Sequence, residues 1–445
     1  MPGRVQLVIL DDDPTGVQTV HGCLLFTRWD PETLRAGFRH EQPFFYVLTN
    51  TRAREPEAAR RITEEIVANV LALNREFGHQ LLFMSRSDST LRSHFPIEIN
   101  AVVEAVEEEL GRVLDAVFLV PAFFEGGRLT AGDVHYVLDD DRRVPASDTE
   151  YARDSVFGYS TSHLPSYIEE KTGGAVPAEE VLSVSLRLLR TDERGELRQF
   201  LDDLSDRRYV VVNAESYADL ERFAEGVLRV VEQGKRFAFQ SAASVVKALA
   251  RVPDKPLLDG GIARDRGAGL FIVGSHVQKT TRQLNRLLES TNVGGIELDV
   301  EAILARSGAL QVDAQDNIES VMADGVTPVV YTSREELRFD SKRERLAAGQ
   351  RISEFLAAIV RSLADPPAYL VAKGGITAHD VLVQGLEIDS AVVLGQTLPG
   401  VPTIAAPEGN RFRGMPYVIF PGNVGGDEAL LEVYRKFEQE TEGRR

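Results

Sequence analysis

The sequence predicts an α/β fold with two doubly wound, mostly parallel-sheet domains and an interdomain active-site cleft. Short apolar runs rich in β-branched residues alternate with longer amphipathic stretches, a rhythm typical of βαβ units. Polar residues, charged residues or glycine follow most of these runs within a few positions. A stretch rich in Pro, Gly and charge, residues 252–269, interrupts the rhythm in the middle of the chain. We therefore expect domains at residues 1–262 and 263–445.

The apolar runs give the expected strands. In the first domain they are residues 5–10, 44–49, 80–84, 116–120 and 208–213, and in the second 269–273, 328–332, 368–372 and 414–420. Apolar residues at helical spacing predict helices that include residues 57–73, 96–110 and 217–232. Residues 130–172 carry no long periodic segment and predict an irregular excursion or lid near the site.

Composition excludes several classes of partner. The chain has 445 residues and a net charge of −18, which argues against binding nucleic acid or an anionic membrane surface. Cys23 is the single cysteine, so no intrachain disulfide can form and a reducing compartment fits. No apolar run approaches the roughly 20 residues that span a bilayer. We expect a cytoplasmic protein with no nucleic-acid or membrane partner, and a homodimer stays open.

Three adjacent acids follow the first strand: Asp11, Asp12 and Asp13, before the turn residues Pro14 and Gly16. In open α/β sheets, ligands bind beyond the carboxyl ends of the strands. Carboxylates there can orient a hydroxyl, act as a base or hold Mg²⁺. A solvated turn is the alternative, but the mutual repulsion of three acids favours a functional site.

Arginines follow the next strands. Arg52 comes after the second, and Arg86 and Arg92 flank Asp88 after the third. The guanidinium fork matches carboxylate or phosphate oxygens. The stretch Ser-Asp-Ser-Thr at 87–90 can cap a helix and expose backbone N–H groups to an anion. Together with the acids after the first strand, these side chains predict a pocket for a small hydroxylated acid. The alternative is that they are separate helix caps and surface ion pairs.

Glycine follows three strands of the second domain. The loops contain Gly274-Ser275, Gly374-Gly375-Ile376-Thr377 and Gly422-Asn423-Val424-Gly425. Glycine lets the backbone approach a phosphate, and helix N-termini favour an anion. Three such loops in one domain predict a nucleotide site. The chain has neither a Gly-x-x-x-x-Gly-Lys-Ser/Thr loop nor a Gly-x-Gly-x-x-Gly turn after a strand, so an ordinary P-loop kinase or Rossmann dehydrogenase is not expected.

These residues together resemble the four-carbon acid sugar kinase family, which includes kinases for threonate, erythronate and 3-oxo-tetronate. The resemblance spans nearly the whole chain and rests on six motifs in order. They are Asp12-Asp13-Pro14-Thr15-Gly16, Arg86-Ser87-Asp88-Ser89-Thr90-Leu91-Arg92-Ser93, Pro121-Ala122-Phe123-Phe124-Glu125-Gly126-Gly127-Arg128, Gly274-Ser275, Gly374-Gly375-Ile376-Thr377 and Gly422-Asn423-Val424-Gly425.

The resemblance implies that the N-terminal domain binds the sugar acid and the C-terminal domain binds ATP. The expected substrate contacts are Asp12, Arg52, Arg86, Ser87, Asp88, Ser89 and Arg92. The expected nucleotide contacts are Ser275, Gly374, Gly375, Ile376, Thr377, Gly422, Asn423 and Gly425. The chain departs from the family pattern at Arg86 (lysine), Ser93 (glycine) and Ile376 (often acidic).

The sequence therefore predicts ATP- and Mg²⁺-dependent phosphorylation of a hydroxyl on a small, four-carbon sugar acid. Asp12 or Asp13 would orient or deprotonate the attacking hydroxyl, and which of them is the base stays open. One alternative is a haloacid-dehalogenase-like phosphatase that uses Asp11 and Asp13, with Asp139 and Asp140 as further Mg²⁺ ligands. Another is a non-catalytic sugar-acid sensor.

Overall fold

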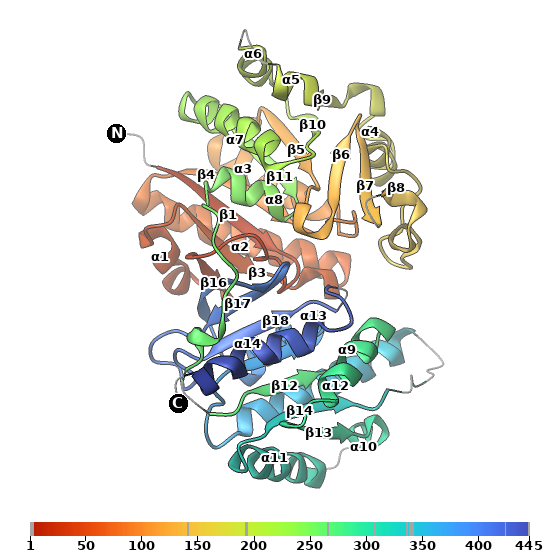
Figure 1. The fold of residues 1–445 in the computed structure, drawn as a ribbon. Coiled ribbons are helices and arrows are strands. Elements are labelled where there is room, and N and C mark those ends of the chain that lie inside the picture. Colours follow the sequence, from red (N-terminus) through yellow and green to blue (C-terminus); the bar gives the residue numbers. More distant parts are fainter. Residues whose placement is uncertain are drawn as a thin grey trace. The chain divides into compact units, whose positions relative to one another are not determined.

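The computed structural model describes residues 4–139, 142–191, 195–264, 267–305, 308–334, 337, 342–422 and 424–443. The chain divides into two compact units, Met1–Asp254 and Lys255–Arg445. We call them unit 1 and unit 2 and describe each by itself (Figure 1). The domain boundary expected at residues 262 and 263 stays a prediction.

Unit 1 contains a parallel sheet in the order β2-β3-β1-β4-β11-β5-β10-β9. Its strands are β1 (Val5–Asp11), β2 (Leu24–Phe26), β3 (Phe44–Leu48), β4 (Gln80–Arg86), β5 (Ala116–Val120), β9 (Leu182–Val184), β10 (Arg208–Val212) and β11 (Phe237–Ser241). Helices cover both faces, so the central strands read as continuous apolar runs rather than as alternating patterns.

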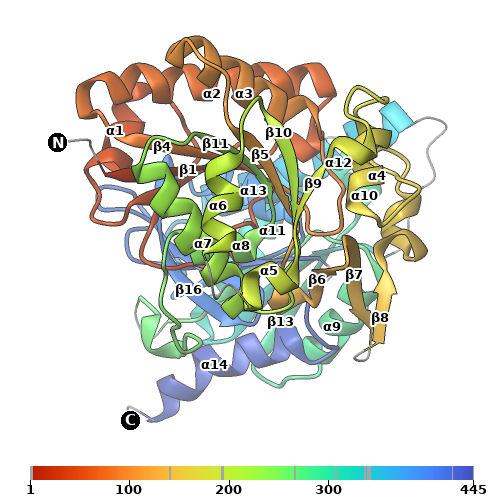
Figure 2. The same ribbon diagram turned by 90° about the horizontal axis from the view of Figure 1, so that it is seen from above.

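The helices of unit 1 are α1 (Pro31–Arg39), α2 (Pro56–Phe77), α3 (Ile97–Leu110), α4 (Leu164–Lys171), α5 (Leu186–Arg190), α6 (Glu196–Asp203), α7 (Tyr217–Glu232) and α8 (Ala243–Leu249). Figure 2 shows α2 and α3 along one face of this sheet and α6, α7 and α8 along the other. Local signals set several of their ends. Asp30 caps α1, Gly78 ends α2 with φ +67°, and a reciprocal Ser216–Asp219 capping box begins α7.

The excursion predicted at residues 130–172 has regular structure. It contains most of a three-stranded antiparallel sheet of β6 (Arg128–Ala131), β7 (Val134–Asp139) and β8 (Arg142–Pro145), followed by short 3-10 turns and helix α4. Its strands have four to six residues. Periodicity is difficult to recognise in segments this short, which is why the sequence pattern predicts an irregular segment here.

In unit 2 the sheet strands are ordered β13-β14-β12-β15-β18-β17-β16. Pairing is parallel from β13 to β18, and β17 pairs antiparallel with both β18 and β16. The strands are β12 (Leu270–Val273), β13 (Val293–Leu298), β14 (Thr327–Thr332), β15 (Leu370–Lys373), β16 (Ser390–Leu398), β17 (Val401–Ala405) and β18 (Pro416–Phe420).

The helices of unit 2 are α9 (Gln278–Leu288), α10 (Val300–Leu304), α11 (Gly308–Ala323), α12 (Lys342–Ser362), α13 (Gly375–Asp380), which continues into a π-helical turn, and α14 (Ala429–Gly443). Side chains of α9 and α14 form one buried cluster with β12, β15 and β18. Both units are therefore mostly parallel α/β folds, as the sequence predicts.

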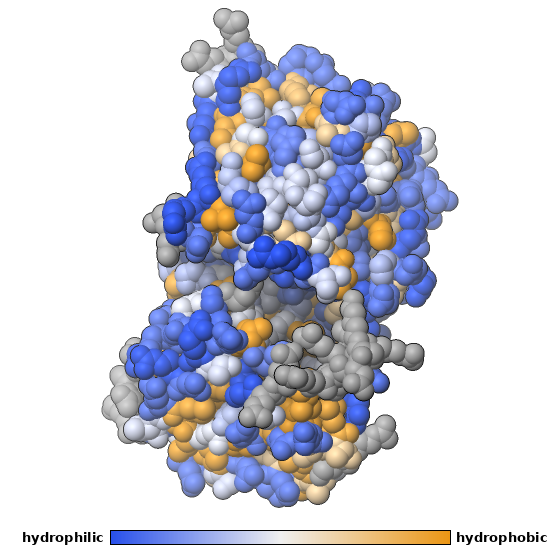
Figure 3. All heavy atoms as spheres, turned by 90° about the vertical axis from the view of Figure 1, so that its right-hand side faces the viewer, coloured by the Kyte–Doolittle hydropathy of each residue, from blue (hydrophilic) through white to orange (hydrophobic). Residues whose placement is uncertain are grey.

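Among the described residues, no helix has the length and apolarity needed to cross a membrane. Hydrophilic residues cover most of the face drawn in Figure 3, and hydrophobic residues there occur in separate groups.

Candidate active site

The carboxyl end of β1 is a switch point in unit 1. The chain places β3 on one side of β1 and β4 on the other, so the connections that leave these strands diverge. Such a divergence leaves a crevice where ligands bind in open α/β sheets. The register aligns Asp11 with Leu48 of β3 and Arg86 of β4, and Arg86 with Ser241 of β11. The predicted acidic and basic residues therefore meet at one edge of the sheet.

Arg52 binds both of the aspartates predicted to be catalytic. Its Nε and Nη2 donate to the two carboxylate oxygens of Asp12 at 3.0 and 2.5 Å, and its Nη1 donates to Asp13 at 3.1 Å. The side chain of Asp12 is 3% exposed, against 18% for Asp13 and 22% for Arg52. Asp13 also accepts bonds from the Thr15 backbone N–H and hydroxyl. The pair is thus held in one geometry, with Asp13 the more accessible carboxylate.

Ionisation differs between these two acids. Burial raises the pKa of Asp12, although Arg52 opposes the rise. Burial also favours the neutral form of Asp13, but Arg52 and the two bonds from Thr15 outweigh it and hold the pKa of Asp13 below its usual value. Asp12 is therefore the more basic carboxylate, and Asp13 stays ionised.

Asp11 lies beneath this pair and is fully buried. Arg86 Nη1 donates to Asp11 Oδ1 at 3.2 Å, and Arg86 Nη2 donates to Gln18. Burial raises the pKa of Asp11 to about 7 against the opposing charge of Arg86. A Cβ on Gly16 would lie 1.8 Å from Asp11 Oδ2, so only glycine fits there. The Asp11 carboxylate is enclosed, which disfavours the predicted alternative in which it is a phosphatase nucleophile.

Arg86, Ser87 and Ser89 are all buried in the structure, whereas Asp88 and Arg92 reach the rim. Arg92 Nε donates to Asp88 at 2.8 Å, and the Thr90 hydroxyl also bonds to Asp88. Burial opposes ionisation of Asp88, but Arg92 and Arg52 outweigh it and hold its pKa well below the usual range. Arg92 also stacks over the Tyr151 ring, 4.9 Å from its centre. These contacts hold Asp88 and Arg92 in one ion-pair network at the rim of the site.

The segment that follows β6 supports the loop of Ser87–Arg92 from the side. His135 Nε2 donates to the Ser89 carbonyl at 2.7 Å, while Tyr159 and Tyr167 donate to the carbonyls of Thr90 and Leu91 at 2.9 and 3.0 Å. Burial lowers the pKa of His135 to about 4, so its ring is neutral and can also accept from Thr130. Three successive carbonyls of the predicted substrate loop are therefore fixed.

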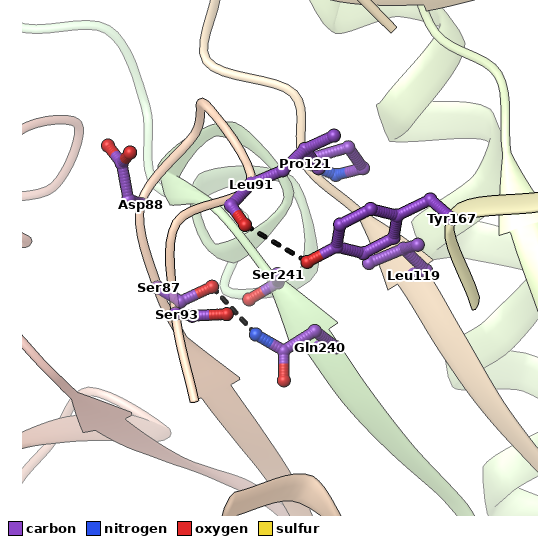
Figure 4. Close-up of a pocket in the computed structure, with 9 residues that line it drawn as sticks. All are labelled: Ser87, Asp88, Leu91, Ser93, Leu119, Pro121, Tyr167, Gln240 and Ser241. Carbon is purple, nitrogen blue, oxygen red and sulfur yellow. Dashed lines mark hydrogen bonds between the residues drawn. The ribbon is translucent and has the colours of Figure 1, made fainter. Parts of the chain in front are cut away.

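A small cavity lies behind this loop, beyond the ends of β4, β11 and β5 (Figure 4). Its polar lining comes from Ser87, Ser93, Gln240 and Ser241, and Gln240 Nε2 donates to Ser87 Oγ at 2.6 Å. Asp88 also lines it, but Figure 4 shows its carboxylate away from the cluster of these four side chains. Sequence analysis did not recognise β11 as a strand and so missed Gln240 and Ser241, the polar pair that ends it.

Unit 2 has its own switch point at the carboxyl end of β12, because β14 lies on one side of β12 and β15 on the other. The three glycine loops follow β12, β15 and β18, which are neighbours. The register aligns Val273 with Lys373 and Lys373 with Phe420. The loops predicted to contact the nucleotide therefore begin side by side.

These loops touch each other. Gly374 has φ +113°, and a Cβ there would lie 3.0 Å from the Ser275 Cβ. The Thr280 hydroxyl contacts Ser275 Oγ at 3.2 Å and the Gly422 carbonyl at 3.3 Å. A Cβ on Gly274 would meet Thr377 Oγ1 at 2.2 Å. At this edge the loops contact one another through closely approaching backbone rather than through charged side chains.

The remaining predicted nucleotide residues are placed as follows. Gly375 begins α13, Ile376 follows it with 57% of its surface exposed, and Gly425 adopts φ +82°. Asn423 lies outside the described residues, as does Asp140 of the alternative site.

Two side chains that sequence analysis did not single out hold the glycine loops. Gln283 Nε2, from fully buried Gln283 on α9, contacts the carbonyls of Val424, Gly425 and Gly426 at 3.1, 3.4 and 2.8 Å. Lys373 Nζ donates to the Pro421 carbonyl at 2.6 Å. Burial lowers the pKa of Lys373 to about 6. Gln283 lies within helix α9 and Lys373 ends strand β15, where the sequence pattern is typical of the core. No sequence pattern therefore indicated their role.

Two family models match the chain. A sugar-binding N-terminal domain matches residues 7–249, and a nucleotide-binding C-terminal domain matches residues 270–430. The chain belongs to the four-carbon acid sugar kinase family. The predicted resemblance is thereby confirmed, and the chain is 26% identical to a D-erythronate kinase from Heliobacterium modesticaldum over 95% of each chain.

Solved structures share the fold of this sugar kinase family member. A Salmonella typhimurium LT2 structure matches with a TM-score of 0.70 and 17% identity, over 98% of this chain and 100% of that one. A Haemophilus influenzae protein of the DUF1537 family matches with a TM-score of 0.64 and 18% identity, over 97% of this chain and 100% of that one. Both matches extend over the two units.

Proposed function

We propose that this protein is an ATP-dependent kinase that phosphorylates a hydroxyl of a four-carbon sugar acid, with the acid bound in unit 1 and ATP in unit 2. One observation carries the proposal: each unit presents a switch-point site, and the two sites have complementary chemistry. Unit 1 offers carboxylates and guanidinium groups, which suit a hydroxylated acid. Unit 2 offers glycine loops in close contact, which suit a phosphate chain.

D-erythronate is the first substrate to test, because the curated relative named for it aligns over 95% of both chains. Arg52 and Arg92 are partly exposed cations at this strand-end edge of unit 1, and we assign the substrate carboxylate to them. Arg86 is 4% exposed and bound to Asp11, so we expect it to support the site from beneath. The roles predicted for Ser87, Asp88 and Ser89 stay predictions.

Asp12 is the better candidate for the base. A base that works near neutral pH needs a raised pKa, and burial shifts Asp12 in that direction while Asp13 shifts the opposite way. Arg52 fixes both carboxylates, so proton removal from a bound hydroxyl requires no rearrangement of Asp12. Phosphoryl transfer depends mainly on this positioning and on charge neutralisation.

The residues present fit ATP. Ser275 lies close to both Gly374 and Gly422, and the absence of a Cβ at Gly374 leaves the space that we propose as a cradle for the phosphates. Mg²⁺ in such enzymes is held by one or two carboxylates and the phosphates, and it neutralises charge on the transferred group. Among the described residues no cluster of three or more metal-ligating side chains occurs. Asp13, the more exposed of the two carboxylates, is the one we assign to this ion.

The test is ADP release with Mg-ATP across D- and L-erythronate, D- and L-threonate and 3-oxo-tetronate. Acid-dependent ADP release, with a phosphorylated acid found by mass spectrometry, is the expected result. Release of phosphate from a phosphorylated acid without ATP, together with an aspartyl-phosphate at Asp11, would support the phosphatase instead. Binding of an acid without turnover would support the sensor.

A further inference from the structure

The cavity behind the Ser87–Arg92 loop contains hydrogen-bonding atoms that the protein leaves unpaired. Gln240 Oε1 and Ser241 Oγ are both buried and have no hydrogen-bond partner among the residues that the structure describes. Gln240 is 3% exposed and Ser241 is 2% exposed. A buried polar atom without a partner costs about 1–3 kcal/mol, so such atoms are usually satisfied by water or by a ligand. Two of them in adjacent residues lining one cavity indicate a bound group.

The lining selects the chemistry of that group. Gln240 Oε1 can only accept a hydrogen bond, whereas the hydroxyls of Ser241 and Ser87 can donate or accept. Ser87 Oγ already accepts from Gln240 Nε2, which leaves its O–H available to donate. Neither an Arg nor a Lys lines the cavity. A carboxylate or phosphate would be repelled by Gln240 Oε1 and left without a counter-charge, whereas a neutral hydroxyl both donates and accepts.

The size of the cavity agrees with one such group. Its volume is about 10 Å³, close to the roughly 10–15 Å³ that a single buried water requires. Leu91, Leu119, Pro121 and Tyr167 form its apolar walls (Figure 4). Tyr167 cannot retreat easily, because its hydroxyl is bonded to the Leu91 carbonyl at 3.0 Å. A space of this size fits one oxygen atom.

The cavity also lies at the proposed substrate edge. Ser241 aligns with Arg86 across β11 and β4, and Arg86 aligns with Asp11 across β4 and β1. The backbone N–H of Ser87 donates to the Ser241 carbonyl at 2.8 Å. The cavity and the Asp12–Arg52 pair are therefore parts of one strand-end surface in unit 1.

We infer that Gln240 and Ser241, with Ser87, form a specificity subsite for one non-reacting hydroxyl of the sugar acid. This inference rests on the proposed function. The subsite distinguishes acids by the presence of a hydroxyl at one carbon, and it rejects acids with a larger substituent there. A missing hydroxyl leaves buried polar atoms unpaired, which is how sites of this kind discriminate strongly.

The experiment combines two variants with two kinds of acid. Ser241→Ala and wild type are assayed with the best acid from the panel and with analogues of it that each lack one hydroxyl. Ser241→Ala is expected to lower kcat/KM for the complete acid about five- to tenfold, with an unchanged KM for ATP. For one analogue, wild type and variant should be equally slow, because the group that Ser241 binds is absent.

A second variant, Ser241→Thr, keeps the hydroxyl but adds a methyl group to the cavity. Its kcat/KM for the complete acid should fall, because the added methyl group occupies the space of the bound hydroxyl. Its kcat/KM for the analogue that lacks this hydroxyl should stay as in wild type. Thr63→Val is the matched control, since Thr63 also carries a buried unpartnered hydroxyl but lies on α2, away from the cavity. Thr63→Val should leave the kinetics with every acid unchanged.

If Ser241→Ala lowers kcat/KM equally for the complete acid and for every analogue, the inference is wrong and the cavity holds a structural water. If wild type phosphorylates no acid, the proposed kinase function fails, and calorimetry with the same acids and variants then tests the subsite by binding alone. Weaker binding to Ser241→Ala that disappears for one analogue would support the subsite. Absence of binding to wild type would overturn it.

Discussion

The two units use the same topological device with opposite chemistry. In each, the first parallel strand has a later strand on either side, and the loops after it form the candidate site. Unit 1 fills that edge with Asp12, Asp13, Arg52 and other charges held in ion pairs. Unit 2 fills it with glycine loops, one of which is held by the neutral amide of Gln283.

The difference teaches what each kind of ligand requires. A small acid with several hydroxyls offers few atoms, so its site must supply directional side chains fixed by their neighbours. A phosphate chain is highly charged and is bound well by backbone N–H groups, provided that no Cβ intervenes. Substitutions should therefore act through charge in unit 1 and through backbone space in unit 2.

The largest effect is expected from removing the two aspartates of unit 1 that we propose as catalytic. The double variant Asp12→Asn/Asp13→Asn should lower kcat by about 100-fold or more, because a lost general base costs about 10²–10⁴-fold. The KM for the acid should change far less, since Arg52 and Arg92 remain. Steady-state ADP release measures both values. Asp427→Asn, which removes an exposed acid of unit 2, is the control, and an unchanged kcat in the double variant would refute the assignment.

The next effect concerns stability. Arg86→Met leaves the Asp11 carboxylate buried without its partner, so the free energy of unfolding should fall by about 3–5 kcal/mol. In Arg282→Met, the lost pair with Asp427 is 52% and 51% exposed, and the loss should stay below about 1 kcal/mol. Urea denaturation followed by circular dichroism compares them.

Arg86→Lys restores the residue found in the family pattern and should recover most of the loss from Arg86→Met. Similar destabilisation by Arg86→Met and Arg282→Met would show that charge burial is not what distinguishes the two units.

A smaller effect is expected from the backbone of unit 2. Gly374→Ala should raise the KM for ATP about tenfold, because its φ of +113° is strained for alanine and the new Cβ would lie 3.0 Å from Ser275. The KM for the acid should not change. Gly409→Ala is the matched control, with φ +91° and no atom within 4 Å of the new Cβ. An equal rise of the KM for ATP in both variants would contradict the proposed cradle.

The last prediction is a pH dependence of stability from Lys373. Its pKa is about 6 in the folded state against 10.5 for the ordinary side chain, so between these values the unfolded state binds more protons. Stability should therefore rise with pH in this window, by at most about 1.4 kcal/mol per pH unit, and the gain should be fully lost below pH 6. Lys373→Met should remove this slope between pH 7 and 9.

Denaturant midpoints at each pH measure the slope in wild type and variant. The Lys373 ammonium also lies 4.0 Å from the centre of the Phe420 ring, a contact that favours the charged form. A flat profile in wild type would mean that this contact, rather than burial, sets the charge of Lys373.

Sequence alone predicted the elements with strong patterns. The strand at residues 116–120 and the helix at 217–232 have the predicted bounds, because a buried apolar run and an amphipathic repeat with a capping box are local signals. It missed the short strands β2 and β6–β9, and it also missed β11, β13, β16 and β17. Two of these carry Gln240 or paired glycines, which dilute the apolar run.

The candidate site divides in the same way. The sequence by itself determined which residues end strands, and parallel topology then requires Asp12, Arg52 and Asp88 to share one edge. Tertiary structure decided how each is paired there: Arg86 is buried against Asp11 rather than exposed, Arg52 joins two aspartates, and β7 and α4 fix the Ser87–Arg92 loop. Burial and pairing depend on neighbours distant in the chain, and no local pattern encodes them.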